Sequence, residues 1–210
     1  MSLLQVSGPQ LTLRYAAADD APALFALASD PEVTRFFSWG PYERVEETLA
    51  WIDGLPAKRA AGELLELAIV HPRHGPIGAT ALSELSIRDR RATVGTWIGR
   101  AHWGSGANAE SKALIAALAF GALGLDRLTA YASTANARSQ TALERVGFAR
   151  EGVLRHFHRH PGAVHDVVVS SMLREEWEAS PLAAVPAQVT GEPPAAFVAA
   201  GRPAGASRRG

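Results

Sequence analysis

One stretch of the chain, residues 92–124, constrains the fold most, because it places a strand pattern, a glycine-containing loop and a long apolar helix in direct succession. The loop carries Gly104 and Gly106, and the helix pattern ends at Gly124, a residue type common just past a helix end. The first turn of a helix leaves backbone N–H groups unpaired and carries partial positive charge. Glycines let such a backbone approach an anion closely. The stretch therefore favours a phosphate or diphosphate site, and a tight turn that binds nothing is the alternative.

Two better-known phosphate loops do not fit this spacing. A P-loop requires Gly-Lys-Ser/Thr, whereas Ala107 and Asn108 follow Gly106 here. The dinucleotide fingerprint requires a third glycine where Ala109 stands, and a βαβ unit near the N-terminus. Neither condition is met, so these two loops are excluded on spacing, and a plain nucleotide-phosphate binder is left as a remote alternative.

Strand and helix patterns alternate on both sides of the loop. Period-2 alternation and turn residues predict strands, and period-3.6 stripes predict helices. The predicted strands are residues 11–15, 64–70, 77–87, 92–98, 128–132, 148–159 and 164–174. The predicted helices are residues 19–29, 43–55, 107–124 and 136–146. This order indicates an α/β or α+β fold with helices on the faces of one sheet.

Composition separates the expected domain from its ends. Residues 181–210 are rich in proline and alanine and poor in large apolar side chains, so burial cannot offset their ordering entropy. We expect a flexible N-terminus over residues 1–9, one domain over residues 10–180 and a flexible tail over residues 181–210. The exception would be residues 195–200, if Phe197 docks on a partner chain.

Charge and residue usage exclude several classes of protein. The chain has 21 basic and 21 acidic side chains, and this neutral balance argues against a broad nucleic-acid surface. The longest apolar run, residues 113–123, is too short to span a bilayer, and no leader pattern precedes Leu11, so we expect a cytoplasmic protein without membrane contact. The chain contains no cysteine, which excludes disulfides, thiolate metal sites and a cysteine-acyl intermediate.

Four blocks of sequence resemble one known family. Residues 103–110 (WGSGANAE) resemble the acetyl-CoA diphosphate loop of the GCN5-related N-acetyltransferases, the GNAT superfamily. The others match its Rim-type branch, which contains ribosomal-protein N-terminal acetyltransferases. The second block is NARS (136–139) with LERVGF (143–148), and the third is EGVLR (151–155). The fourth is HDV (165–167) with LREEW (173–177). The blocks fall in the family's order and the resemblance covers about residues 11–177.

This resemblance implies a GNAT-like mixed, mostly antiparallel sheet of about seven strands with about four helices. It also implies an N-acetyltransferase that moves an acetyl group from acetyl-CoA, without a metal, to a primary amine by direct attack. The amine would belong to a protein N-terminus or a small molecule. A non-catalytic CoA-binding sensor or assembly module is the alternative, and a homodimer is left open.

The resemblance assigns the coenzyme to three places. The pantetheine arm would run along the strand 92–98 and hold it apart from the strand 128–132, with an N–H near Ile98 polarising the carbonyl. The diphosphate would lie on the amides of the glycine loop, and the start of helix 136–146 would complete the site. The implied coenzyme residues are Trp97, Ile98, Gly99, Trp103, Gly104, Ser105, Gly106, Ala107, Asn108, Asn136 and Ser139.

The same resemblance suggests the catalytic groups. Ser139 matches a position that can protonate the departing thiolate, although it could be a plain coenzyme contact, and Asn136 could simply cap its helix. His158 matches a position where a Glu can serve as base, and a neutral imidazole could do this near pH 7. A solvated edge-strand histidine and a water chain are the alternatives. Two positions depart from the family pattern: Ala101 replaces Gln or Arg, and Thr93 replaces a Glu that would be a candidate base.

Three further features have structural interpretations. On a regular strand His156, His158 and His160 would share one face but spread too far to bind one metal ion. Asp166 would pair with an arginine such as Arg155 and hold two strands in register. Trp39 lies in the connection that lines the acceptor groove in this family, where an aromatic residue is more often core than specificity determinant.

Overall fold

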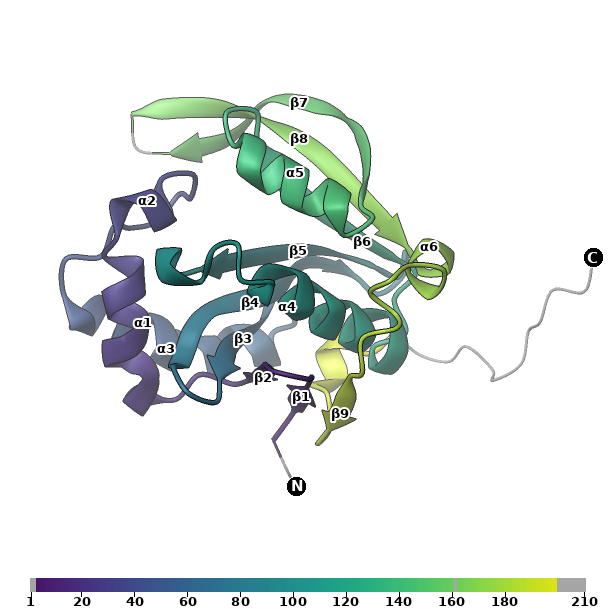
Figure 1. Cartoon of the computed structure of the whole chain (residues 1–210), viewed down its shortest axis with the longest axis horizontal. Helices are drawn as coiled ribbons and strands as arrows, with labels where there is room; N and C mark the ends of the chain where they lie inside the picture. Colours follow the sequence, from purple (N-terminus) through teal and green to yellow (C-terminus); the bar gives the residue numbers. More distant parts are fainter. Residues whose placement is uncertain (1–2, 161, 200–210) are drawn as a thin grey trace, which may run out of the picture.

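The protein forms one nine-stranded sheet in a computed structural model, which describes residues 3–160 and 162–199 (Figure 1). The strand order is β7-β8-β6-β5-β4-β3-β2-β1-β9, and every pair is antiparallel except β5 with β6. The strands are β1 (Gln5–Ser7), β2 (Thr12–Arg14), β3 (Leu64–His71), β4 (Gly75–Ser86), β5 (Arg91–Ile98), β6 (Arg127–Ser133), β7 (Ala149–His160), β8 (Ala163–Leu173) and β9 (Gln188–Thr190). The expected mixed, mostly antiparallel sheet is confirmed, with two strands more than expected.

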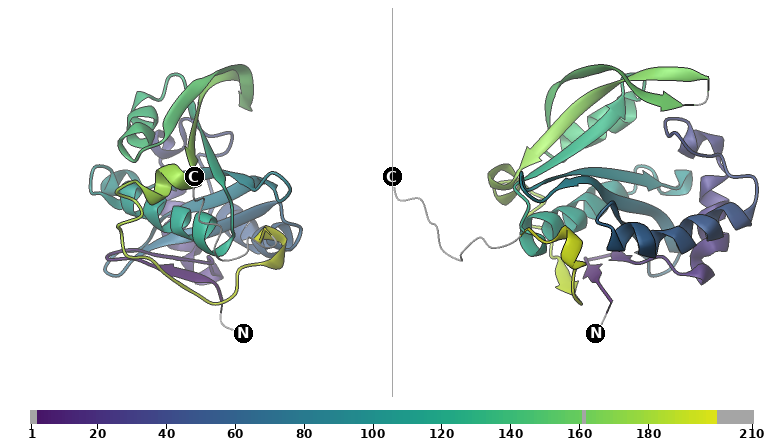
Figure 2. Two further views of the ribbon diagram at one scale, coloured as in Figure 1. Left: turned by 90° about the vertical axis from the view of Figure 1, so that its right-hand side faces the viewer. Right: turned by 180° about the vertical axis from the view of Figure 1, so that it is seen from behind.

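Helices cover both faces of the sheet. They are α1 (Ala21–Ala28), α2 (Pro31–Thr34), α3 (Val45–Ala60), α4 (Ala107–Ala116), α5 (Ala137–Arg145) and α6 (Arg174–Glu178). A π-helical segment, Ala117–Ala122, prolongs α4 toward Gly124 as the sequence predicts. The helices α4 and α5 lie in front of the sheet in Figure 1, and α3 comes to the front when the molecule is seen from behind in Figure 2.

The main core lies between the sheet and α4. Alternate residues of β3, Leu65, Leu67 and Ile69, are fully buried on this face, and Leu114 of α4 is buried opposite them. On the other face a smaller cluster joins α1 to α3 through residues such as Leu24 and Ile52. Burial on both faces fixes the sheet between its helices, so the ends of its central strands form a rigid frame for a site.

The parallel pair at the centre of the sheet is short. The strands β5 and β6 pair only where Arg91–Thr93 lie beside Arg127–Thr129, and beyond this point they diverge. Figure 1 shows β6, β8 and β7 leaning away from the rest of the sheet toward the side where α2 lies. The divergence expected from the family resemblance is therefore present, and it separates the strand ends that precede α4 and α5.

Both ends of the chain differ from the expectation of flexibility. In the N-terminal segment, Leu4 and Val6 are buried and β1 pairs with β2. In the C-terminal segment, β9 pairs with β1, and Phe197 is fully buried in the core of its own chain. The predicted tail was wrong for residues 181–199, because a few apolar side chains there find sites in the existing core; residues 200–210 lie outside the described part.

Within the described residues, no helix is both long and apolar enough to cross a membrane.

Candidate active site

A cavity of about 1070 Å³ occupies the space where β5 and β6 diverge. Its wall includes the glycine loop, the start of α4, the start of α5, the end of β7 and the loop after α2. Of the residues that the sequence predicts for the site, those in this wall are Trp97, Ile98, Trp103, Gly104, Gly106, Asn108, Asn136, Ser139 and His158. Tertiary structure therefore brings together residues from four separate sequence blocks.

The glycine loop has the backbone that the sequence predicts. Gly104 and Gly106 have φ of +75° and +91°, a conformation that residues with a Cβ rarely adopt, and Gly106 is the N-cap of α4. The Ser105 hydroxyl donates to the carbonyl of His102 and accepts the N–H of Ala107. These bonds hold the loop so that the first turn of α4 opens on the cavity, which is the arrangement that a helix N-terminus needs to bind a diphosphate.

Trp103 fixes the loop to both walls of the cavity. Its indole N–H donates to the carbonyl of Ile98 at the end of β5, over 2.7 Å. On its ring face lies the guanidinium of Arg138 from α5, 3.2 Å from the ring centroid. This cation–π contact joins the glycine loop to the opposite half of the sheet, and it places a positive charge beside the expected diphosphate position.

Three expected coenzyme residues lie beside the cavity rather than in its described lining. Gly99 is covered by Leu27, whose Cδ2 would be 2.4 Å from a Cβ at that position, and its N–H donates to Ile77. Ser105 and Ala107 contribute to the shape of the loop. For these residues the sequence pattern predicts a local backbone geometry, and contact with the coenzyme stays a prediction.

At the start of α5, Asn136 is the N-cap, as its residue type suggests. Its side-chain oxygen accepts the N–H of Ser139 at 3.1 Å. Because Ser139 lies in the same first turn, both side chains face the cavity. The cap and the coenzyme contact are compatible, since the amide nitrogen of Asn136 is not needed for the cap.

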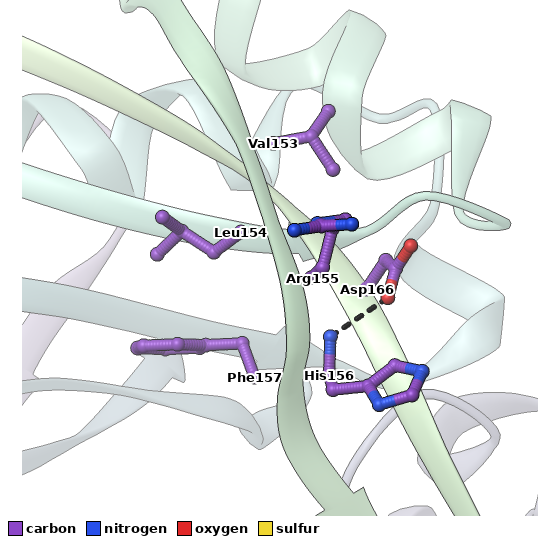
Figure 3. Close-up of a pocket in the computed structure, with 6 residues that line it drawn as sticks. All are labelled: Val153, Leu154, Arg155, His156, Phe157 and Asp166. Atoms are coloured by element: carbon purple, nitrogen blue, oxygen red, sulfur yellow. Dashed lines mark hydrogen bonds between the residues drawn. The ribbon is translucent and has the colours of Figure 1, made fainter.

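A β-bulge changes the expected arrangement of histidines in β7. The register shifts between Leu154 and His158, and His156 has a φ of +52°. As a result His158 and His160 line the main cavity, whereas His156 lies in a separate open pocket on the other side of the strand (Figure 3). The expected common face was therefore wrong, because a regular pleat does not continue through the bulge.

The same bulge defines the partner of Asp166. Its carboxylate accepts the backbone N–H of His156 at 2.8 Å, and Figure 3 shows this bond between β8 and β7. Asp166 thus holds the strand pair in register, as expected, but through a backbone group rather than through Arg155. Residues within the described ranges form no cluster of three or more side chains suited to a metal ion.

Sequence reasoning missed Glu84, which structure places at the position left open by Thr93. A bulge in β4 shifts the register between Ser83 and Ser86, and Glu84 there has a φ of +49°. The Thr93 hydroxyl donates to its carboxylate over 2.7 Å. Among the described cavity-lining residues Glu84 carries the one carboxylate. The sequence shows that residue 84 is acidic, but it carries no signal for the bulge that turns this side chain toward the cavity.

Tyr131 of β6 connects the two candidate bases. Burial and then the charge of Glu84 raise the pKa of the Tyr131 phenol, while a hydrogen bond to Thr93 opposes this rise. The Tyr131 ring also lies edge-on to the His158 ring, with centroids 5.8 Å apart. Glu84 and His158 therefore flank one phenol on the cavity wall.

Another part of the cavity wall is aromatic. Trp39 packs edge-on against Trp97 with ring centroids 5.5 Å apart, and it also contacts Phe37 and Tyr42. Both Trp39 and Phe37 line the cavity. The connection after α2 thus forms a cavity wall, while Trp97 anchors it to β5.

Comparisons with known proteins agree with this arrangement. Residues 10–149 match the family described as Acetyltransferase (GNAT) domain. The chain is 33% identical over 169 residues to the "Uncharacterized N-acetyltransferase YoaA" of Bacillus subtilis (strain 168). The aligned region covers 79% of this chain and 94% of that protein.

Two solved structures share the fold at lower identity. Mycobacterium smegmatis RimJ in complex with CoA-disulfide has a TM-score of 0.73 at 23% identity, covering 86% of this chain and 90% of that one. The Microcin C7 self immunity acetyltransferase MccE, in complex with acetyl-CoA and AMP, has a TM-score of 0.70 at 20% identity. This match covers 79% of this chain and 93% of that one. The expected likeness to Rim-type enzymes is confirmed for the fold, and the chain belongs to the GNAT family of acetyl-CoA-dependent acetyltransferases.

Proposed function

We propose that the protein transfers the acetyl group of acetyl-CoA to a primary amine by direct attack of the neutral amine on the thioester. The observation that carries this proposal is the single cavity that extends from the glycine loop to the aromatic wall around Trp39. A coenzyme at one end and an amine at the other would meet between β5 and β6, so the reacting atoms are brought together without a covalent enzyme intermediate.

The proposed roles follow from the geometry of the wall. When bound, acetyl-CoA supplies the activated acetyl thioester. The amides of Gly104–Asn108 hold the diphosphate with the charge of Arg138 nearby, and the arm passes Trp97 and Ile98, where a backbone N–H polarises the carbonyl. Asn136 and Ser139 contact the arm from the opposite side. The amine then enters past Trp39, and it belongs to a protein N-terminus or to a small molecule.

The acceptor class is tested by following the release of free thiol from acetyl-CoA with a panel of N-terminal peptides and small amines. We expect turnover with at least one class of primary amine and acetylation of that amine by mass spectrometry. Thiol release without an acetylated amine, or coenzyme binding without turnover across the panel, would contradict the proposal and favour a CoA-binding module.

We propose that Ser139 donates a proton to the departing thiolate. Ser139→Ala should then lower kcat about 10²-fold with little change in coenzyme affinity, because a general acid acts only in the transition state. Ser133→Ala provides a matched control, since Ser133 also lines the cavity but is outside the proposed machinery. If Ser139→Ala raises the coenzyme Kd and leaves kcat unchanged, the residue is a binding contact instead.

The base that accepts the proton of the amine is proposed to be one of the two groups that flank Tyr131, His158 or Glu84. Single substitutions separate them. If His158 is the base, His158→Ala lowers kcat/KM about 10²-fold and Glu84→Gln leaves it near the wild-type value. If Glu84 is the base, the two variants show the reverse. Wild-type kcat/KM in both variants would exclude this wall and leave the role to water.

A further inference from the structure

Lys112 is a buried basic group that the roles above do not use. It lies in the second turn of α4, its residue is 5% exposed, and it belongs to the lining of the main cavity. The chain contains only one other lysine, Lys58, which is exposed near the end of α3. A buried lysine is costly and rarely retained without a partner, so its position in the cavity calls for a ligand.

The protein itself supplies only part of what this amino group needs. Lys112 Nζ donates to the hydroxyl of Thr96 on β5. Thr96 is bonded to the Thr80 hydroxyl at 2.8 Å, and Thr80 donates onward to the carbonyl of Gly95 at 3.0 Å. This chain of bonds fixes every hydroxyl proton and leaves Thr96 as an acceptor for lysine. An ammonium group carries three donors, and within the described residues one acceptor is seen for them.

The electrostatics agree with an incomplete site. Burial alone lowers the pKa of Lys112 to about 7, and no charged group of the described residues contributes to this shift. A carboxylate partner would instead stabilise the charged form. The amino group is thus held inside the cavity by a neutral hydroxyl, without an anion to offset its desolvation.

Its place in the fold indicates which ligand could complete it. Thr96 lies beyond Thr93, the last residue of β5 that pairs with β6, and so stands where β6 has diverged. Lys112 of α4 bonds to Thr96 beside this gap, and Ala130 and Ala132 of β6 line the same cavity. In the proposed function this gap holds the amide-bearing arm of the coenzyme, whose carbonyl oxygens are acceptors.

We propose that the Lys112 amino group is a coenzyme-binding residue that donates a hydrogen bond to a carbonyl oxygen of the pantetheine arm while Thr96 holds it in place. This inference rests on the proposed position of the coenzyme. It predicts that coenzyme binding changes the environment of Lys112 and, because the nearby diphosphate is negative, favours its protonated form.

The binding test uses calorimetry with 3′-dephospho-CoA, because this probe lacks the 3′-phosphate monoester that would itself titrate near pH 6. Lys112→Met keeps the apolar stem of the side chain and removes its amino group, and the exposed Lys58→Met is its matched control. We expect Lys112→Met to weaken binding about 10- to 100-fold and Lys58→Met to leave it unchanged. At pH 7.5, buffers of different ionisation enthalpy should reveal proton uptake by the wild type and by Lys58→Met, but not by Lys112→Met.

A second measurement keeps the inference testable should Lys112→Met fold poorly. With two lysines in the chain, ¹³C labelling at lysine Cε gives two side-chain signals in the wild type. We expect one signal to titrate near neutral pH in the free protein and to titrate at higher pH when 3′-dephospho-CoA is bound, while the Lys58 signal does not move.

Several results would overturn the inference, and they are distinguishable from failure of the proposed function. Unchanged affinity of Lys112→Met, or a Lys112 signal that does not respond to the bound probe, refutes the contact while leaving the coenzyme site in place. Absence of binding by the wild type refutes the position of the coenzyme itself. A mass increase of one acetyl group at Lys112 after incubation with acetyl-CoA would make this residue an acceptor instead of a contact.

Discussion

Gly106→Val is expected to abolish measurable coenzyme binding while the domain stays folded. The φ of +91° at Gly106 costs a residue with a Cβ about 1–2 kcal/mol, and a β-branched residue more, so the loop would leave its present conformation. A Cβ at this position meets no atom within 4 Å, so packing is not disturbed. We expect the coenzyme Kd in calorimetry to rise about 100-fold or more, because the N–H groups at the start of α4 lose their alignment.

Gly75→Val is the matched control for this experiment. Gly75 also has a positive φ, +67°, and a Cβ there also meets nothing within 4 Å, but it is the first residue of β4 and lies outside the cavity lining. The two variants should lose similar amounts of stability in thermal melts, and only Gly106→Val should lose binding. Equal coenzyme affinity in both variants would contradict the assignment of the diphosphate to the glycine loop.

Phe197→Ala is expected to lower the free energy of unfolding by about 3–5 kcal/mol, the usual range for a fully buried phenylalanine. Phe197 is completely buried in the main core, and the adjacent N–H of Ala199 donates to the carbonyl of Leu123 just after the π-helical segment. The C-terminal segment therefore covers the core beside the end of the π-helical segment. Denaturant unfolding monitored by circular dichroism measures the difference.

The neighbouring Val198 provides the control, since 37% of its surface is exposed. Val198→Ala should change stability by less than about 1 kcal/mol. If Phe197→Ala also stays within this range, the C-terminal segment contributes little to the fold, and the flexible tail expected from its composition would be the better description of residues 181–199.

The sequence predicted local geometry most accurately where one residue type has few alternatives. Gly104 and Gly106 mark backbone conformations that other residues avoid, and Asn136 is a residue type that caps helices, so the loop and the start of α5 were predictable. The divergence of β5 from β6 also followed, but only through the family resemblance, because nothing in the composition of the two strands states where pairing ends.

Register was the main source of error. A bulge adds residues to one strand and interrupts the regular alternation of its side chains at that point, yet it leaves the hydrophobic pattern almost unchanged. For this reason the inward position of Glu84 and the separation of His156 from His158 could not be read from the chain. The predicted partner of Asp166, Arg155, was wrong because of the same bulge. The carboxylate binds the backbone N–H of His156, which becomes available only there.

The amino-acid sequence by itself thus determined the order of the seven longer strands, the glycine loop and the family, because these depend on short-range periodicity, backbone preference and the local motifs that carry the resemblance. Only the tertiary structure decided which groups share the cavity. It buried Lys112 against Thr96, turned Glu84 toward Tyr131 and placed Phe197 in the core. These are contacts between residues far apart in the chain, and their free energy depends on burial and register, which exist only once the sheet has formed.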